Sequence, residues 1–505
     1  MKDYKVFSNW DLSGLGTILT PESGGSESPL NKAHVQRLIK DSAGSSVDAI
    51  LCCPTILRCP LWDSAARPYW SEPESDIPIP PIPECKNSSQ RTMKRVREYV
   101  KAGGDPLRET YEAVRACGMD FFFSLRMNDW HNLNEITPDN HNEYPTVDRF
   151  YKQHPEYRVG EINEHNTVGW KKMNPYTQDY MHEEVREHYL ALVDELLNLF
   201  PVDGLELDFM RCGNYFKESQ LEQGTRVMTE FILKVRKRLD ETGRELPLCL
   251  RMPAKFDECA MLGFDLVTLA KQNAFQYVTI SSSYIEGLDL EIEKFKQNLP
   301  GVKVFGEIQS MVMNGAKNGW PFERRMTDEM YYAAANSILR RGADGITLFN
   351  YQFLRPLVLA GHKKPQEPDI SNDVLRHLTD RDYLRTCGKH YFVSPAYAAH
   401  WDDVLPAVGT FPLEVRLFDD PALYKSAKLR LVSKQPGLTA KAALRGVALS
   451  ECGSGELYSP FTNEGLPEPG EAVSFTVDTA LLSDINTFEI TSEGEVYLAE
   501  LALYV

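Results

Sequence analysis

The sequence predicts an α/β fold, a (β/α)₈ TIM barrel, followed by an antiparallel β-sandwich. Two observations support this fold class. Short apolar runs alternate with helical patterns over the first 350 residues, and from about residue 400 the pattern changes to apolar–polar alternation. Strand–helix units in series build a parallel sheet, and eight parallel strands close into a barrel. An open doubly wound sheet is the second interpretation, but no glycine-rich phosphate motif follows the first strand.

Eight short apolar runs are the predicted barrel strands. They cover residues 5–11, 47–53, 119–127, 202–210, 246–252, 276–283, 302–308 and 343–350. The clearest helix is predicted for 179–200, where one face carries Val185, Tyr189, Leu192, Val193, Leu196 and Leu197. The loops after the second and third strands are long. In the first of them, the proline-rich segment 72–84 is predicted to be stiff and extended and to help frame a cleft.

Residues 1–390 form the predicted catalytic barrel, and residues 391–505 form the predicted accessory sandwich. After a last helix that ends near Gly388, runs with a period of two begin at about residue 400, separated by glycine, proline and asparagine turns. Such runs are typical of an antiparallel sandwich. Because they hold no aromatic cluster and no catalytic constellation, we expect the sandwich to have a structural or accessory role.

The 505 residues have an ordinary globular composition, with 42% hydrophobic and 25% charged residues. Lys and Arg number 55 against 72 Asp and Glu, and the net charge of −17 disfavours nucleic acid as a partner. No apolar run reaches the ~18 residues of a membrane span, so no membrane partner is expected. The ten cysteines form no CxxC pair, which favours buried free thiols over a zinc site.

The first residues, MKDYKVFSNWDLSG, lack the apolar core and cleavage site of a signal peptide. We therefore expect a cytoplasmic protein, and free cysteines fit such a reducing compartment. The alternative is a periplasmic or secreted protein whose leader is absent from this sequence. No pattern in the sequence predicts a cofactor or the oligomeric state.

Alternation along each strand predicts which side chains point into the barrel. In 202–210 the apolar Leu205, Leu207 and Phe209 take the helix-facing side, so the intervening residues point inward. The inward set comprises Asn9, Asp11, Ser124, Arg126, Asn128, Gly204, Glu206, Asp208, Cys249, Arg251, Thr279, Ser281, Ser283, Phe305, Glu307 and Gln309. Active sites of this fold lie at the carboxyl ends of the strands. The polar residues at those ends are Arg126, Asn128, Asp208, Arg251 and Glu307.

Asp208 and Glu307 come from strands four and seven, on opposite walls of the predicted mouth. Cleavage of a glycosidic bond requires two such carboxylates, because one protonates the leaving oxygen while the other stabilises or attacks the sugar carbon. The simpler interpretation of inward acids is a structural ion-pair lattice, for example Glu206 with Arg126 or Arg251. For Asp208 and Glu307, nearer the mouth, the catalytic interpretation is favoured.

Six of the seven tryptophans fall at predicted strand ends or in loops over the same face. Such aromatic side chains make flat platforms that suit sugar rings. Packing of the long loops is the alternative, for Trp170 above all. The six are Trp10, Trp62, Trp70, Trp130, Trp170 and Trp320.

Several segments resemble a known family. They are SNWDLSG at 8–14, FFFSLRMNDWH at 121–131, HPEY at 154–157 and NPYTQDYMHEEVREHYLALVDELLNLFPVDGLELDFMR at 174–211. Together they resemble the bacterial glycosyl-hydrolase-like barrels that are similar to glycoside hydrolase family 10. The resemblance implies a carbohydrate-active TIM barrel in which Asp208 matches the acidic residue of strand four and Arg211 matches the arginine that follows it. Strand four departs from the pattern in its additional acid, Glu206, and in lacking the Asn–Glu pair of typical family 10 members.

From these observations we predict a glycoside hydrolase that cleaves a poly- or oligosaccharide, with Asp208 as general acid/base and Glu307 as nucleophile. The reverse roles stay open, and retention is preferred over inversion. Further substrate contacts are predicted for Trp10, Asp11, Arg126, Asn128, Asp129, Trp130, His131, Glu206, Arg211, Arg251, Tyr284, Trp320 and Asn350. The arginines point weakly to an anionic uronate or sulfated glycan, and pairing with local acids explains them equally well.

Two alternatives belong to other functional classes. The first is a non-catalytic carbohydrate-binding barrel that uses the same aromatic residues. The second is a metal-dependent hydrolase, which needs paired histidines at the strand ends. Of the 11 histidines only His131 is well placed, so we expect no metal site.

Overall fold

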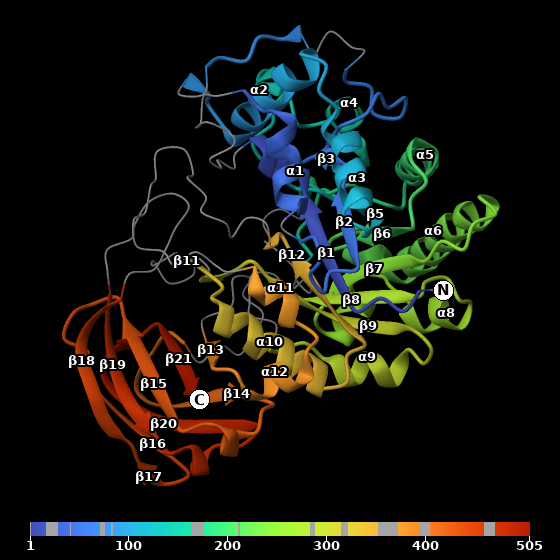
Figure 1. Ribbon diagram of the computed structural model, residues 1–505. Coiled ribbons are helices and arrows are strands. Elements are labelled where there is room, and N and C mark those ends of the chain that lie inside the picture. Colours follow the sequence, from blue (N-terminus) through green and yellow to red (C-terminus); the bar gives the residue numbers. More distant parts are fainter. Residues whose placement is uncertain are drawn as a thin grey trace.

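The main body of the protein is a closed barrel of eight parallel strands, which confirms the predicted fold class (Figure 1). The computed structural model describes residues 2–16, 29–40, 42–70, 76–81, 84–163, 175–210, 213–282, 288–314, 322–351, 372–393, 405–458 and 470–505. All eight predicted strands are present. They are β1 (Val6–Asp11), β2 (Ala49–Cys53), β5 (Asp120–Arg126), β6 (Gly204–Asp208), β7 (Leu248–Pro253), β8 (Tyr277–Ser281), β9 (Lys303–Gln309) and β12 (Gly345–Phe349).

Neighbouring strands follow the order β1-β12-β9-β8-β7-β6-β5-β2, and β2 closes the barrel against β1. Parallel strands need crossover connections, and helices on the outside of the barrel supply them. The outer helices are α1 (Lys32–Lys40), α3 (Pro106–Ala116), α5 (Glu183–Leu199), α6 (Leu221–Glu241), α7 (Phe256–Met261), α8 (Leu266–Lys271), α9 (Ile292–Asn298), α10 (Asp328–Arg340), α11 (Asp373–His377) and α12 (Arg381–Thr386).

Helix α5 shows how the sequence pattern produces this layer. All six apolar residues predicted for its inner face are buried, and the helix ends at Leu199, just before the turn that starts β6. Glu183 and Glu184 lie in its first turn, where carboxylates interact favourably with the positive end of the helix dipole. The helix therefore carries the chain from β5 back to the start of the adjacent, parallel β6.

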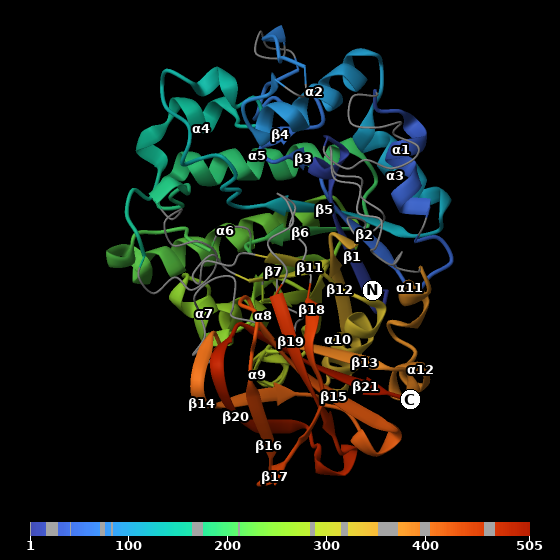
Figure 2. The same cartoon turned by 90° about the vertical axis from the view of Figure 1, so that its left-hand side faces the viewer.

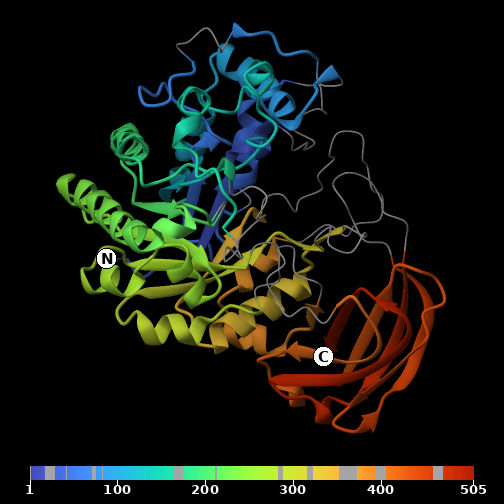
Figure 3. The same cartoon turned by 180° about the vertical axis from the view of Figure 1, so that it is seen from behind.

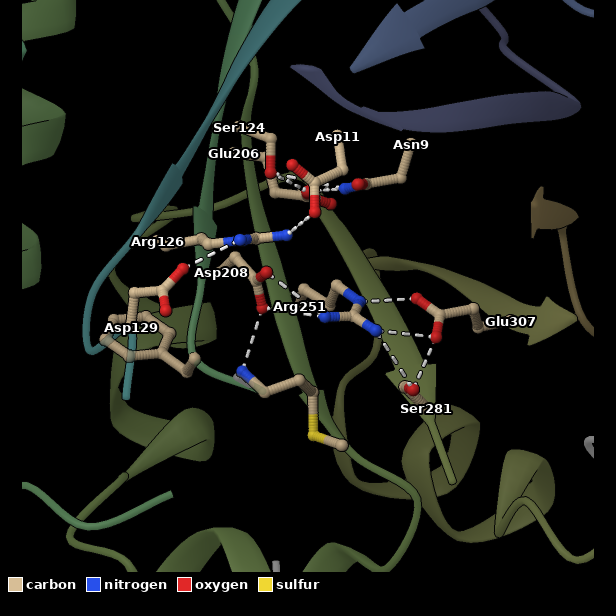
Figure 4. A network of polar contacts seen from close by, with 12 residues as sticks. Asn9, Asp11, Ser124, Arg126, Asp129, Glu206, Asp208, Arg251, Ser281 and Glu307 are labelled. Atoms are coloured by element: carbon tan, nitrogen blue, oxygen red, sulfur yellow. Dashed lines mark hydrogen bonds and ion pairs between the residues drawn. The ribbon is translucent and has the colours of Figure 1, made fainter. Parts of the chain in front are cut away.

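Inside the barrel the side chains form layers that change from apolar to charged along the strands. The amino-terminal layer is an aromatic cluster in which the rings of Phe7 and Phe305 stack at 4.7 Å. The middle layer is polar, and the layer at the carboxyl ends is charged. The predicted inward orientation of the polar residues is confirmed, because those of β1, β5, β6, β7 and β9 hydrogen-bond one another across the interior (Figure 4).

Long connections after β2 and β5 build an additional lobe on the barrel, here called the loop lobe (residues 54–70, 76–81, 84–101, 127–163 and 175–182). It contains β3 (Thr55–Ile56), β4 (Cys59–Pro60), α2 (Ser88–Lys101) and α4 (Arg149–Gln153). A buried ion pair between Arg58 Nε and Asp148 Oδ2, at 2.6 Å, joins its two loops. The loop lobe stands on the side of the barrel away from the sandwich (Figure 2).

The C-terminal region folds into two antiparallel sheets that form the predicted β-sandwich (Figure 3). One sheet contains β13 (Lys389–Val393), β21 (Leu498–Tyr504), β15 (Ser426–Ser433), β19 (Gly470–Val477) and β18 (Ser450–Tyr458). The other contains β14 (Ala407–Arg416), β20 (Ile485–Val496), β16 (Ala440–Leu444) and β17 (Val447–Ala448). Strand β13 lies before the period-two pattern and directly follows α12. A short hairpin, β10 (Met311–Asn314) and β11 (Phe322–Arg325), extends the loop after β9.

Two further features concern the apolar character of the helices and the state of the cysteines. No helix in the described part of the chain is long and apolar enough to cross a membrane. The nine described cysteines are free thiols, most of them buried, as the sequence pattern predicted.

Candidate functional site

Arg251 lies between Asp208 and Glu307 at the carboxyl end of the barrel and binds both (Figure 4). Its Nη1 is 2.9 Å from Asp208 Oδ1, and its Nε is 2.5 Å from Glu307 Oε2. A second bond, from Nη2 to Glu307 Oε1 at 2.8 Å, makes the contact with Glu307 bidentate. The three side chains are at most 2% exposed. The two predicted catalytic carboxylates therefore face each other across the width of one guanidinium group.

The register of the strands explains this arrangement. Arg126 of β5 pairs with Asp208 of β6, which pairs with Arg251 of β7, so three charged residues stand side by side at one level. Glu307 reaches the same guanidinium from β9, which is separated from β7 by β8 alone. The ring of Phe349, at the end of β12, lies 4.2 Å from the Arg251 guanidinium carbon, and this cation–π contact fixes the plane of the group.

Glu307 is more fully hydrogen-bonded than Asp208. Besides Arg251, the hydroxyl of Ser281 donates to Glu307 Oε1 at 2.5 Å, and the side-chain amide of Gln309 donates to the same oxygen. Asp208 Oδ1 accepts one bond from a backbone amide, that of Met210, at 2.9 Å. Glu307 is therefore held by three side chains, whereas Asp208 is held by Arg251 and one backbone amide.

A second arginine binds a second pair of acids beside this centre. Arg126 Nη2 is 2.5 Å from Asp11 Oδ2, and its Nη1 is 2.7 Å from Asp129 Oδ2. Asp129 Oδ1 in turn lies 2.5 Å from His131 Nδ1. Burial by itself would lower the pKa of Arg126. The neighbouring acids, Asp11 first, outweigh burial and raise this pKa above its ordinary value, so Arg126 remains a cation.

Glu206 lies one layer below the charged centre and is fully buried. Asn9 Nδ2 and Ser124 Oγ donate to its Oε1 at 2.8 and 2.7 Å, and its Oε2 has no hydrogen-bond partner among the described residues. Burial, followed by the negative charge of Asp208, raises the pKa of Glu206 to about 8. Glu206 therefore holds a proton at neutral pH. The ion pairs considered for it from the sequence are not formed, because Arg126 and Arg251 bind other acids.

Two of the predicted substrate contacts form hydrogen bonds inside the protein. Asn128 is 1% exposed and its side chain bonds the backbone of Gln178 and Asn214, so it fixes loops. The side-chain oxygen of Asn350 accepts from the backbone amide of Asp11 at 3.2 Å and thereby positions the end of β1.

Most of the described tryptophans pack inside the protein. Trp10 is 3% exposed and lies in the core between strands and helices, because it alternates with the inward Asn9 and Asp11. It was expected near the rim, and this expectation was wrong. Trp62 donates to Glu195 of α5 at 2.9 Å and so attaches the loop lobe to the barrel, whereas Trp70 donates to the carbonyl of Pro60 at 2.8 Å within the lobe.

Trp130 is the described tryptophan best suited to the predicted platform role. It is half-buried at the end of β5, and its ring stacks on His131 at 5.2 Å with the two planes 4° apart. Four of the residues singled out from the sequence lie outside the described part of the chain: Trp170, Arg211, Tyr284 and Trp320.

Several residues of the charged centre were not among the predicted site residues. Ser281 and Gln309 were placed inward by alternation, but neutral side chains carry no signal that distinguishes a ligand of Glu307 from a structural residue. Phe349 ends β12 and could have been found by applying the same alternation to that strand. Among the described residues, no three His, Cys, Asp or Glu side chains come together in a metal-binding arrangement.

Comparisons with known proteins extend no further than distant likeness in structure. No family model matches the chain, and no curated protein matches it either. Among solved structures, it is similar to a chitinase from Chromobacterium violaceum, with 9% identity over 75% of this chain and 98% of that one, at a TM-score of 0.35. It is also similar to alpha-L-fucosidase isoenzyme 1 from Paenibacillus thiaminolyticus, with 15% identity over 97% of both chains and a TM-score of 0.37.

A third similar structure is the Thermotoga maritima alpha-fucosidase in complex with fucose, with 12% identity over 96% of this chain and 94% of that one, at a TM-score of 0.35. At these identities and TM-scores the likeness assigns no family and says nothing of substrate or mechanism. The function has to be judged from the residues of the site itself.

Proposed function

We propose that the protein is a glycoside hydrolase whose catalytic carboxylates are Asp208 and Glu307. One observation carries this proposal: two acids from opposite walls meet at the carboxyl end of a (β/α)₈ barrel, separated by a single guanidinium group. Active sites of this fold lie at that end. Glycosidic cleavage needs two carboxyl groups about 5 to 9.5 Å apart, one for the leaving oxygen and one for the sugar carbon or the attacking water.

The unequal hydrogen bonding of the two acids supports distinct roles. Glu307, held in place by Arg251, Ser281 and Gln309, is suited to act as the nucleophile. Asp208 has fewer donors and lies next to Glu206, which holds a proton at neutral pH, so Asp208 is suited to the proton transfers. The assignment predicts retention of configuration, because the second carboxylate would form a covalent glycosyl intermediate.

In this proposal Arg251 is a positioning residue. It shares one positive charge between two carboxylates and so keeps them close without mutual repulsion. Because Arg126 and Arg251 are both matched by acids, neither offers an unopposed charge to an anionic sugar. The mouth of the barrel therefore suits a neutral sugar unit at the point of cleavage.

The proposal is tested by Asp208→Asn and Glu307→Gln on a panel of plant, algal and host glycans. Each substitution removes one carboxylate, and we expect hydrolysis to fall by at least ~10³-fold while the circular dichroism spectrum is unchanged. The control is Asp203→Asn, on the loop before the same strand, where the side chain binds Arg115 and the backbone amide of Phe121. Full activity in either site variant would contradict the assignment.

The second candidate is a non-catalytic carbohydrate-binding barrel. It is favoured by the observation that both acids are at most 1% exposed and are bound by an arginine. On this alternative no glycan of the panel is cleaved, yet one of them binds. Calorimetry with that glycan then gives the same affinity for Glu307→Gln and for the unaltered protein. Cleavage that depends on Asp208 and Glu307 decides for the hydrolase.

A further inference from the structure

The loop lobe contains a cavity of about 380 Å³ that is separate from the charged centre of the barrel. Its walls come from the loop after β2, helix α2, the loop after β5 and helix α4, all in the upper part of Figure 2. The lining includes Ile77, Pro78 and Ile79 of the proline-rich segment, which was predicted to frame a cleft. None of the residues that bind Asp208 or Glu307 lines it.

The cavity wall carries an excess of positive charge. Its described lining contains five basic residues and one acidic residue, Asp148. Asp148 is already bound by Arg58, at 2.6 Å. Burial alone raises the pKa of Asp148, but Arg58 and Arg67 outweigh that effect and hold the pKa well below its usual range. The basic residues are Arg67, Arg97, Arg149, Lys152 and Arg158.

Arg67 is the most informative of these residues because its guanidinium group is buried and incompletely bonded. The residue is 3% exposed, and its Nε donates to His188 Nε2 at 2.9 Å. Burial and the charge of Arg67 lower the pKa of His188 to about 3, so this partner is neutral. Arg67 Nη2 has no hydrogen-bond partner among the described residues. A buried donor of a charged group that lacks an acceptor is costly, and a small movement of the side chain towards an anion in the cavity would supply one.

Arg158 repeats the pattern on the other loop. Its guanidinium carbon lies 4.4 Å from the ring centre of Tyr151, and its Nε is buried with no hydrogen-bond partner among the described residues. The cavity is thus lined, on two different loops, by two guanidinium groups that each retain an unused donor. Arginine donors of this kind match the oxygens of a carboxylate or a sulfate.

Much of the remaining wall is apolar and stiff. It includes six prolines from three segments of the loop lobe, and these residues have no side-chain donors and few accessible conformations. Rigid apolar walls suit the C–H faces of a sugar ring, and they add little ordering cost on binding. The prolines are Pro60, Pro68, Pro78, Pro138, Pro145 and Pro155.

We propose that this cavity binds an acidic sugar unit, with its carboxylate or sulfate on Arg67 and Arg158. The identification of the ligand as a sugar rests on the proposed function of the barrel, whereas the anionic character rests on the cavity alone. Arg58 joins the two sites, because it binds Asp148 at the cavity and its Nη1 lies 3.5 Å from the carbonyl of Asp129 beside the barrel mouth. The cavity would hold a remote acidic unit of a glycan whose cleaved unit occupies the barrel.

Calorimetry with monosaccharides tests this proposal without involving hydrolysis, because they contain no glycosidic bond. The ligands are glucuronate, galacturonate and glucose 6-sulfate, with glucose and inorganic sulfate for comparison. We expect at least one acidic sugar to bind, glucose not to bind, and Arg67→Gln and Arg158→Gln each to weaken binding ~10-fold or more. Arg244→Gln, a half-buried arginine at the opposite end of the barrel, is the matched control and should bind normally.

Three results would overturn the proposal: no acidic sugar binds, both cavity variants bind as well as the unaltered protein, or inorganic sulfate binds as tightly as glucose 6-sulfate. If Arg67→Gln does not fold, the half-buried Arg158 variant decides. Failure of the hydrolase proposal gives a different result, because acidic sugars would still bind in the cavity while no glycan is cleaved.

Discussion

Among the described residues of the charged centre, the cations Arg251 and Arg126 face four carboxylates, those of Asp11, Asp129, Asp208 and Glu307. A further negative charge one layer below would be repelled by this excess and would have no cation of its own. Glu206 avoids that cost by keeping its proton. The strand pattern predicts which of these residues point inward, but the choice of partners depends on side-chain reach across the barrel, which no sequence pattern contains.

The proton on Glu206 predicts a dependence of stability on pH. Its pKa is raised from 4.5 to about 8 in the folded protein. Between these values the folded state binds one more proton than the unfolded state, so this contribution to stability is full below pH 4.5 and is lost as pH rises towards 8. We expect Glu206→Gln to remove it, since the amide has the same shape and does not ionise. The slope of the free energy of unfolding against pH should differ between the two proteins by ~1.4 kcal/mol per pH unit at most.

Urea unfolding of both proteins at intervals from pH 5 to pH 9 measures this effect. The unaltered protein should lose stability relative to Glu206→Gln as pH rises, and the difference should level off above pH 8. Equal slopes for the two proteins would mean that Glu206 is ionised in the folded state. Asp208→Asn offers a second readout, because removing the neighbouring negative charge should lower the pKa of Glu206.

At the scale of the strand, alternation was sufficient to predict the inner and outer faces of the barrel. The prediction succeeds because the two faces meet different surroundings, an apolar helix layer outside and a polar interior near the mouth. It did not extend to the loops. Trp62 and Trp70 look like rim residues in the sequence, but their indole groups bond Glu195 and Pro60. Likewise, Arg67 and Arg158 lie 91 residues apart in the sequence, and only the folded loop lobe brings them to one cavity.

Strand β6 also shows how a small residue allows the aromatic layer below the site to pack. A Cβ atom added to Gly204 would lie 2.1 Å from the ring of Phe122, which fills the amino-terminal half of the barrel. We expect Gly204→Ala to lower the free energy of unfolding by ~1–3 kcal/mol through overpacking. Gly388→Ala is the control, because its nearest atom would be 3.5 Å away. Urea denaturation measures both, and equal stabilities would contradict the packing explanation.

At the scale of the whole molecule, the barrel and the sandwich share buried surface. Helix α10 is buried on every side from Met330 to Leu339, because the barrel strands lie on one side and β13 on another. Ala333 of α10 packs with the sandwich core, whereas Val432 and Leu498 of the sandwich pack with the core around the barrel. An ion pair of Arg340 with Asp419, at 3.7 Å, crosses the same boundary. The sandwich thus covers a helix that would otherwise expose apolar surface.

This shared core predicts that barrel and sandwich unfold together. Calorimetry should show one main transition, since unfolding the sandwich alone would expose α10 to water. Ala333→Glu places a charge in the boundary without a partner, and we expect it to destabilise the protein by ~3–5 kcal/mol and to shift the whole transition. Ala448→Glu, on the exposed strand β17, is the control and should leave the transition in place. Two separated transitions in the unaltered protein, with only one of them moved by Ala333→Glu, would show instead that the domains fold independently and that the boundary contributes little to stability.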